Sequence, residues 1–173
     1  MTWQLDGARK DGQSVTPAWS PHDQQLIGGV SVREIANVPK QNGWLTEIFR
    51  REWNDGTPFE IDQIFQTILN AGAISAWHAH EITTDRLFVS FGMIRIVLFD
   101  AREGSPTHGR INEFRFGSVR PALIIVPPRV WHGVQNISAE PSVLLNVVDQ
   151  AYDYAAPDHW RVPPDDPSIP FQF

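Results

Sequence analysis

The chain has 173 residues, no cysteine and a formal net charge of −6, which fits one domain with a core of its own. The lack of cysteine excludes disulfides and thiolate metal sites and favours a cytoplasmic protein. The acidic balance argues against a nucleic-acid partner, and no apolar run is long enough to suggest a membrane partner.

The N-terminal segment, residues 1–26, mixes Gly, Pro, Ser and charged residues without periodicity and is expected to form an arm. Short runs rich in Val, Ile, Phe and Trp fill residues 27–154, separated by turn residues such as Asn42-Gly43. We expect these runs to be strands: Val30–Ile35, Trp44–Arg50, Ile64–Asn70, Ile74–His80, Leu87–Phe91, Met93–Asp100, Ile111–Phe116, Ala122–Val126, Val130–Ile137 and Val143–Val148.

Many short strands without a helical period predict a single all-β domain over residues 27–154. The last segment, residues 155–173, contains five prolines. Because proline cannot donate to a sheet ladder, this segment is expected to run extended over the domain without joining a sheet.

Two histidines in the run Ile74–His80 give the first functional signal. His78 and His80 are two residues apart, so in a strand both side chains point to the same face. Paired imidazoles that face an interior are rarely there for packing alone. Core histidines satisfied by backbone groups are the structural alternative. The other histidines, His22, His108 and His159, lie in polar or Pro-rich surroundings and give no such signal.

Two linked motifs surround these histidines. Gly72, His78, His80 and Gly92 match the spacing G-x5-H-x-H-x3–4-E-x6-G, with Asp85 in place of Glu. A second block matches P-x-G-x2-H-x3-N at Pro127, His132 and Asn136, with Arg129 in place of Gly. These blocks resemble the two cupin motifs. The resemblance implies a double-stranded β-helix, the cupin jelly roll, with a ligand or metal inside.

Within the cupins the chain resembles the dTDP-4-dehydrorhamnose 3,5-epimerase family, from about Gly28 to the C-terminus. The matching segments are 43–50, 76–80, 100–109, 128–134 and 163–170, including the string D-x-R-x-x-S-P-T-x-G and the terminal D-D-P. The loop of that string is interpreted as structural. The resemblance implies a homodimer that acts on a nucleotide-linked 4-keto-6-deoxy sugar for polysaccharide or glycoside synthesis, with no cofactor favoured.

The resemblance also implies residue roles. His78 would be the base that removes a proton next to the C4 ketone, and Asp166 would orient it. Arg86 would stabilise the developing oxyanion. The residues expected to contact substrate are Arg50, His80, Arg86, His132 and Tyr152.

The chain departs from the family at three positions. Leu145 occupies the position of the tyrosine that supplies a proton from the opposite face, and Tyr152 and Tyr154 lie nearby. Ser75 and Asn42 replace two arginines that contact substrate.

Alternative functions therefore stay open. His78, His80, Asp85 and His132 suit Zn, Fe, Mn or Ni, as in a metal-dependent isomerase or oxygenase. The H-A-H block is also similar to that of sugar 3,4-ketoisomerases, which need a base and a proton shuttle on one face. A sugar-binding cupin without catalysis is the third alternative.

Overall fold

The computed structural model describes residues 3–17, 21, 25–50, 52–53 and 60–173, and within them every regular element is a β-strand. His22 and part of the expected N-terminal arm lie outside the described residues. The strands are β1 (Ser31–Glu34), β2 (Asn37–Lys40), β3 (Gly43–Thr46), β4 (Gln63–Leu69), β5 (Ile74–Ala79), β6 (Asp85–Phe91), β7 (Met93–Phe99), β8 (Ile111–Gly117), β9 (Ala122–Val126), β10 (Trp131–Asn136), β11 (Ser142–Val148) and β12 (Trp160–Arg161).

Two five-stranded antiparallel sheets face each other. One has the order β1-β9-β6-β11-β4 and the other β12-β5-β10-β7-β8. Alternate residues such as Ile96, Leu98, Phe114 and Ile124 fill the space between the sheets and are almost fully buried. The prediction of an all-β jelly roll is therefore confirmed.

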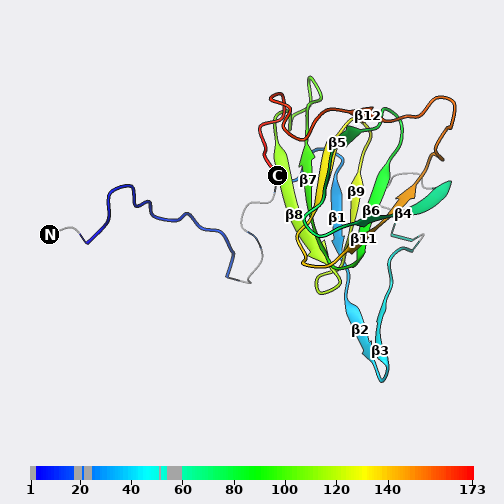
Figure 1. Ribbon diagram of the computed structural model, residues 1–173, viewed down its shortest axis with the longest axis horizontal. Helices are drawn as coiled ribbons and strands as arrows, with labels where there is room; N and C mark the ends of the chain where they lie inside the picture. Colours follow the sequence, from blue (N-terminus) through cyan, green and yellow to red (C-terminus); the bar gives the residue numbers. More distant parts are fainter. Residues whose placement is uncertain (1–2, 18–20, 22–24, 51, 54–59) are drawn as a thin grey trace.

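A third, two-stranded sheet formed by β2 and β3 projects from one end of the body (Figure 1). At the left of the view the described residues 3–17 run away from the two sheets (Figure 1). The described residues contain no helix that is long and apolar enough to span a membrane.

All ten predicted runs overlap observed strands, but β2 and β12 were not predicted. The expectation that residues 155–173 stay out of the sheets is wrong, because Trp160 and Arg161 pair with Ala79 and His78 of β5. These two residues lie between Pro157 and Pro163, so their N–H groups are free to join the edge of β5 without a proline in the ladder.

The rest of the C-terminal segment covers the outer face of the β5 sheet. Trp77 is completely buried there, with its ring 6.1 Å from that of Phe171 and 5.0 Å from that of Phe173. Its Nε1–H donates to the carbonyl of Pro164 at 3.3 Å. Gly133 is required beneath this cover, because a Cβ there would lie 2.7 Å from the Phe173 ring. This packing keeps β5 in place with its other face directed inward.

Candidate active site

His78 lies at the centre of a row of three side chains on adjacent strands. His78 is on β5, and it lies opposite His132 of β10 on one side and opposite Arg161 of β12 on the other. Residues directly opposite each other in antiparallel strands present side chains on the same face. The rings of His78 and His132 have centroids 4.0 Å apart.

Asp85 reaches the same space from the opposite sheet. Its Oδ2 lies 3.3 Å from Nε2 of His80 and 3.2 Å from Nε2 of His132, and its Oδ1 accepts a hydrogen bond from Asn146 at 2.6 Å. Burial opposes ionisation of this carboxyl group, but the hydrogen bonds and the histidine charges keep the pKa of Asp85 below its ordinary value. The site therefore contains a buried carboxylate held by both sheets.

The C-terminal segment closes the site through Asp158. Its carboxylate accepts hydrogen bonds from the backbone N–H groups of Glu81, Ile82 and Thr83 at 2.6, 3.0 and 3.0 Å, and from the Thr83 hydroxyl at 2.9 Å. Although burial opposes ionisation, these bonds lower the pKa of Asp158 to about 2. Nδ1 of His80 contacts the Asp158 backbone carbonyl. The Asp158 side chain thus connects the C-terminal segment to the β5–β6 loop.

His159, the next residue, joins the histidine cluster. Its ring lies 4.9 Å from that of His80 and 5.2 Å from that of His78. Burial and the neighbouring Arg161 lower the pKa of His159 to about 4. Burial, together with the charges of His132 and His159, lowers the pKa of His78 well below its ordinary value. Both imidazoles are therefore neutral at pH 7 and able to accept a proton.

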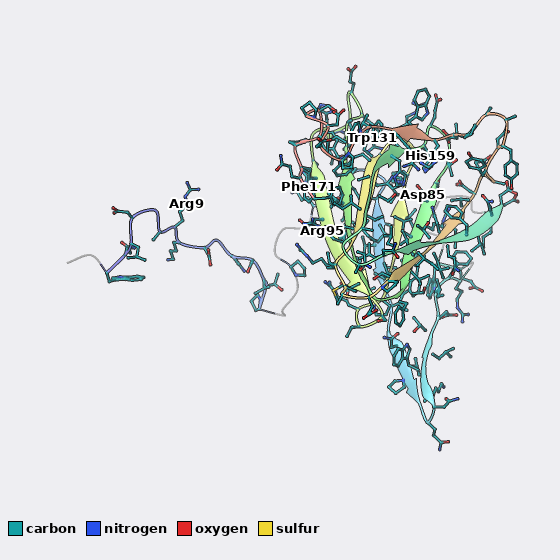
Figure 2. All side chains as sticks on the ribbon, viewed as in Figure 1. Arg9, Asp85, Arg95, Trp131, His159 and Phe171 are labelled. Atoms are coloured by element: carbon teal, nitrogen blue, oxygen red, sulfur yellow. The ribbon has the colours of Figure 1, made fainter. Side chains whose placement is uncertain are left out.

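These side chains line a pocket of about 410 Å³ between the two sheets, within the size range of small-molecule sites. Figure 2 shows Asp85 and His159 directed to the same part of the interior. Arg161 is the one Lys or Arg among the described residues that line it. The pocket combines four histidines, the carboxylates of Asp85, Asp153 and Asp158, and one permanent cation.

The structure brings together four of the predicted site residues. His78, His80, His132 and Tyr152 all line the pocket, with Tyr152 half-exposed at its rim. Asp85, predicted as a candidate metal ligand, lines it as well.

Three predicted residues lie elsewhere. Asp166 does not reach His78, because its carboxylate accepts from the backbone N–H and the hydroxyl of Ser168 in its own turn. Arg86 lies on the opposite face of β6 from Asp85, with Nη1 3.8 Å from the Asp149 carboxylate. Arg50 is exposed and forms an ion pair with Glu47. Among the described residues, Asp166 therefore does not contact His78, and Arg86 and Arg50 do not line this pocket.

Leu145, which occupies the position of the family's tyrosine, does not face the pocket. Leu144, Asn146 and Val148 of β11 face the pocket, and Leu145 between them does not. None of these four residues carries an acidic hydroxyl. Tyr152 lines the pocket on this side, and its backbone N–H donates to Oε1 of Gln63 of β4 at 3.0 Å.

Three residues of the C-terminal segment were missed from the sequence. Asp158, His159 and Arg161 line the pocket, although their Pro-rich surroundings showed no periodicity. The sequence His159-Trp160-Arg161 places two polar residues on either side of an apolar one. This alternation is the sequence signal for a strand that directs His159 and Arg161 to the same face.

Arg129, which replaces the glycine of the second motif, has a φ of 65°. This left-handed conformation explains why the motif favours glycine at this position. The Arg129 N–H donates to the His80 carbonyl at 2.6 Å. The turn therefore keeps the geometry that holds the end of β5 beside β10.

Comparisons with known proteins show which family this chain is similar to. The sequence profile of dTDP-4-dehydrorhamnose 3,5-epimerase matches residues 24–173. The chain is 36% identical over 142 residues to the probable low-salt glycan biosynthesis epimerase Agl13 of Haloferax volcanii, covering 80% of this chain and 89% of that protein. It is 30% identical over 148 residues to the spore coat polysaccharide biosynthesis protein SpsL of Bacillus subtilis, covering 86% and 97%.

A solved structure shows the same fold. The dTDP sugar isomerase of Desulfovibrio desulfuricans superposes with a TM-score of 0.77 at 27% identity, over 84% of this chain and 91% of the other. The matched region contains both sheets and the C-terminal segment that closes the pocket. The chain belongs to the dTDP-4-dehydrorhamnose 3,5-epimerase family.

Proposed function

We propose that this chain epimerises a nucleotide-linked 4-keto-6-deoxy sugar and that His78 removes the proton next to the ketone. The observation that carries the proposal is the state of His78 in the pocket. Its Nδ1 is buried and has no hydrogen-bond partner among the described residues, and its low pKa keeps the ring neutral. A neutral, unpartnered imidazole nitrogen in a ligand-sized pocket is suited to accept a proton from a substrate.

The proposed step is a proton transfer, and it calls for no redox cofactor. The C–H bond beside a ketone breaks heterolytically, the proton moves to His78, and the electron pair is delocalised onto the ketone oxygen as an enolate. Inversion requires the proton to return from the other face. Tyr152, anchored to the opposing sheet through Gln63, is the proposed donor on that side.

Isotope exchange tests this function. In D2O the chain should introduce deuterium at C3, at C5 or at both positions of a dTDP-4-keto-6-deoxyhexose, and NMR or mass spectrometry would locate the label. Exchange at a single carbon would define the substrate position that faces His78. Tight binding of the nucleotide sugar without any exchange would contradict the proposal and support a binding protein.

Arg161 is the proposed contact for the negative charge of the substrate, since it is the permanent cation of the pocket. A guanidinium binds phosphate oxygens through paired N–H donors. Arg161→Gln should therefore raise KM by about 10- to 100-fold, equal to about 1.4–2.7 kcal/mol of binding, and change kcat less. Arg161→Lys should restore part of the loss. An unchanged KM in Arg161→Gln would exclude this contact.

The proposed biological setting is synthesis of a surface polysaccharide or glycan, in line with the names of both relatives. We also propose a homodimer. Trp44 and Leu45 of the projecting hairpin and Ile64 and Ile68 of the edge strand β4 are more than half exposed, and such apolar surface usually marks an interface. A single-chain mass in sedimentation equilibrium would contradict the dimer.

A further inference from the structure

Two imidazole nitrogens and one carboxylate oxygen converge beside the proposed base. Nε2 of His80 and Nε2 of His132 lie 3.3 and 3.2 Å from the same oxygen, Oδ2 of Asp85, and all three atoms are within 4.8 Å of one another. They come from the end of β5, from β10 and from β6, so both sheets contribute. His132 and Asp85 are almost fully buried.

In the His80 and His132 rings, the Nδ1 atoms contact backbone carbonyls, and this leaves the Nε2 atoms to face Asp85. Nδ1 of His80 contacts the backbone carbonyl of Asp158, and Nδ1 of His132 lies 3.2 Å from the carbonyl of Val130. A carbonyl only accepts, so each Nδ1 carries a proton, and Nε2 of a neutral ring then has a free electron pair. In neutral rings both Nε2 lone pairs face the Asp85 carboxylate, so the three atoms form a set of donors able to bind a cation.

The spacing of the three atoms fits a small divalent metal ion. In a tetrahedral zinc site with bonds of about 2.0–2.1 Å, neighbouring ligand atoms are about 3.3 Å apart. The two distances to Asp85 match that value. Metal-bound histidines usually donate their second N–H to a carbonyl, and ligating carboxylates are hydrogen-bonded in turn. The contacts to Asp158 and Val130, and the bond from Asn146 to Asp85, supply this outer shell.

We propose that His80, Asp85 and His132 bind one divalent transition metal ion, for which Zn²⁺ is the best match. Two histidines and a carboxylate form one of the three-ligand sets of catalytic zinc, in which a fourth position stays open. His78 and His159 also lie near His80, but a set with Asp85 includes the negative charge that balances a cation. His78 remains free as the base.

The binding site stands on its own geometry, whereas its role in the reaction rests on the proposed function. A cation here would lie next to His78 and stabilise negative charge on the enolate oxygen of the substrate. That charge stabilisation was predicted for Arg86, which lies on the other face of β6. The metal would thus supply the enolate stabilisation that was predicted for Arg86.

The test uses tag-free full-length protein, stripped with a chelator and titrated with ZnCl2 and, separately, CoCl2. We expect one Zn²⁺ per chain by calorimetry and elemental analysis, a higher Tm, and visible absorption bands of tetrahedral Co²⁺. Asp85→Asn and His80→Gln should each weaken binding by about 100-fold or more, as expected for loss of a ligand. His78→Asn and the exposed His108→Asn should bind as the wild type does.

Circular dichroism of each variant separates loss of the site from loss of the fold. His80 is only partly buried, so His80→Gln keeps the test valid where Asp85→Asn fails to fold. If folded wild-type protein retains no zinc and gives no cobalt band, the proposal is wrong, and the contacts of Asp85 are ordinary hydrogen bonds with the two imidazoles. Isotope exchange with stripped and loaded protein separates the two proposals. Zinc binding without exchange refutes only the function, and exchange without zinc binding refutes only the metal site.

Discussion

Replacing His78 with asparagine is expected to lower the rate of deuterium exchange into the sugar by about 10²- to 10⁴-fold, the usual contribution of a general base. The substitution removes the buried, unpartnered Nδ1 of His78 while keeping a polar side chain between His132 and Arg161. Because His78 is only partly exposed and packs against His132, the fold of the variant should be compared by circular dichroism before rates are interpreted.

A matched histidine controls for general effects. His108 is exposed in the loop after β7, and His108→Asn should exchange deuterium at the wild-type rate. If His78→Asn also keeps the wild-type rate, the base is another histidine of the cluster. His159, neutral and with a buried unpartnered Nε2, would then be the residue to replace.

Replacing Asp100 with alanine is expected to reduce the free energy of unfolding by about 3–5 kcal/mol, the cost of breaking a buried ion pair. Asp100 is fully buried and accepts from Nε and Nη2 of Arg102 at 2.8 and 2.9 Å. The hydroxyls of Ser105 and Thr107 donate to it at 2.7 and 2.6 Å. Alanine would leave all these donors without their acceptor. Urea denaturation at neutral pH measures the change.

The loss should extend beyond the loop itself. Nη2 of Arg102 and Oγ1 of Thr107 also hold the backbone of Gly28, at 2.8 and 2.9 Å, so Asp100 connects the loop to the start of the domain. A Tm lower by roughly 10 °C is expected for a chain of this size. Glu103→Ala, an exposed change in the same loop, should alter the free energy of unfolding by less than about 0.5 kcal/mol. Equal effects of the two substitutions would contradict this role for Asp100.

The fold could be predicted because local signals and tertiary packing agree. Alternation predicts that His78 and His80 share one face, and motif spacing adds His132 and Asp85 to the same site. The loop from Asp100 to Gly109 was expected to be structural, and its hydrogen bonds confirm this.

The rest of the site depends on contacts between distant parts of the chain. A position match assigned Asp166 to His78, but the carboxylate is held within its own turn by Ser168. Arg86 follows the inward Asp85 by one residue, and in a strand that difference reverses the face. Arg161 belongs to the two-residue strand β12 and His159 directly precedes it, and such a strand is too short for a periodic pattern to be recognised in the sequence.

The C-terminal closure also sets an order of assembly. Asp158, His159 and Arg161 complete a pocket whose other walls come from residues 63–153. A ribosome releases the chain from its N-terminus onwards, so the other nine strands of the two five-stranded sheets are available to fold before β12 is. The jelly roll is therefore able to fold first with its pocket open on the side that Asp158, His159 and Arg161 later cover. The pocket is therefore completed only after residues 158–161 have left the ribosome, when Arg161 pairs with β5 and Asp158 binds the β5–β6 loop.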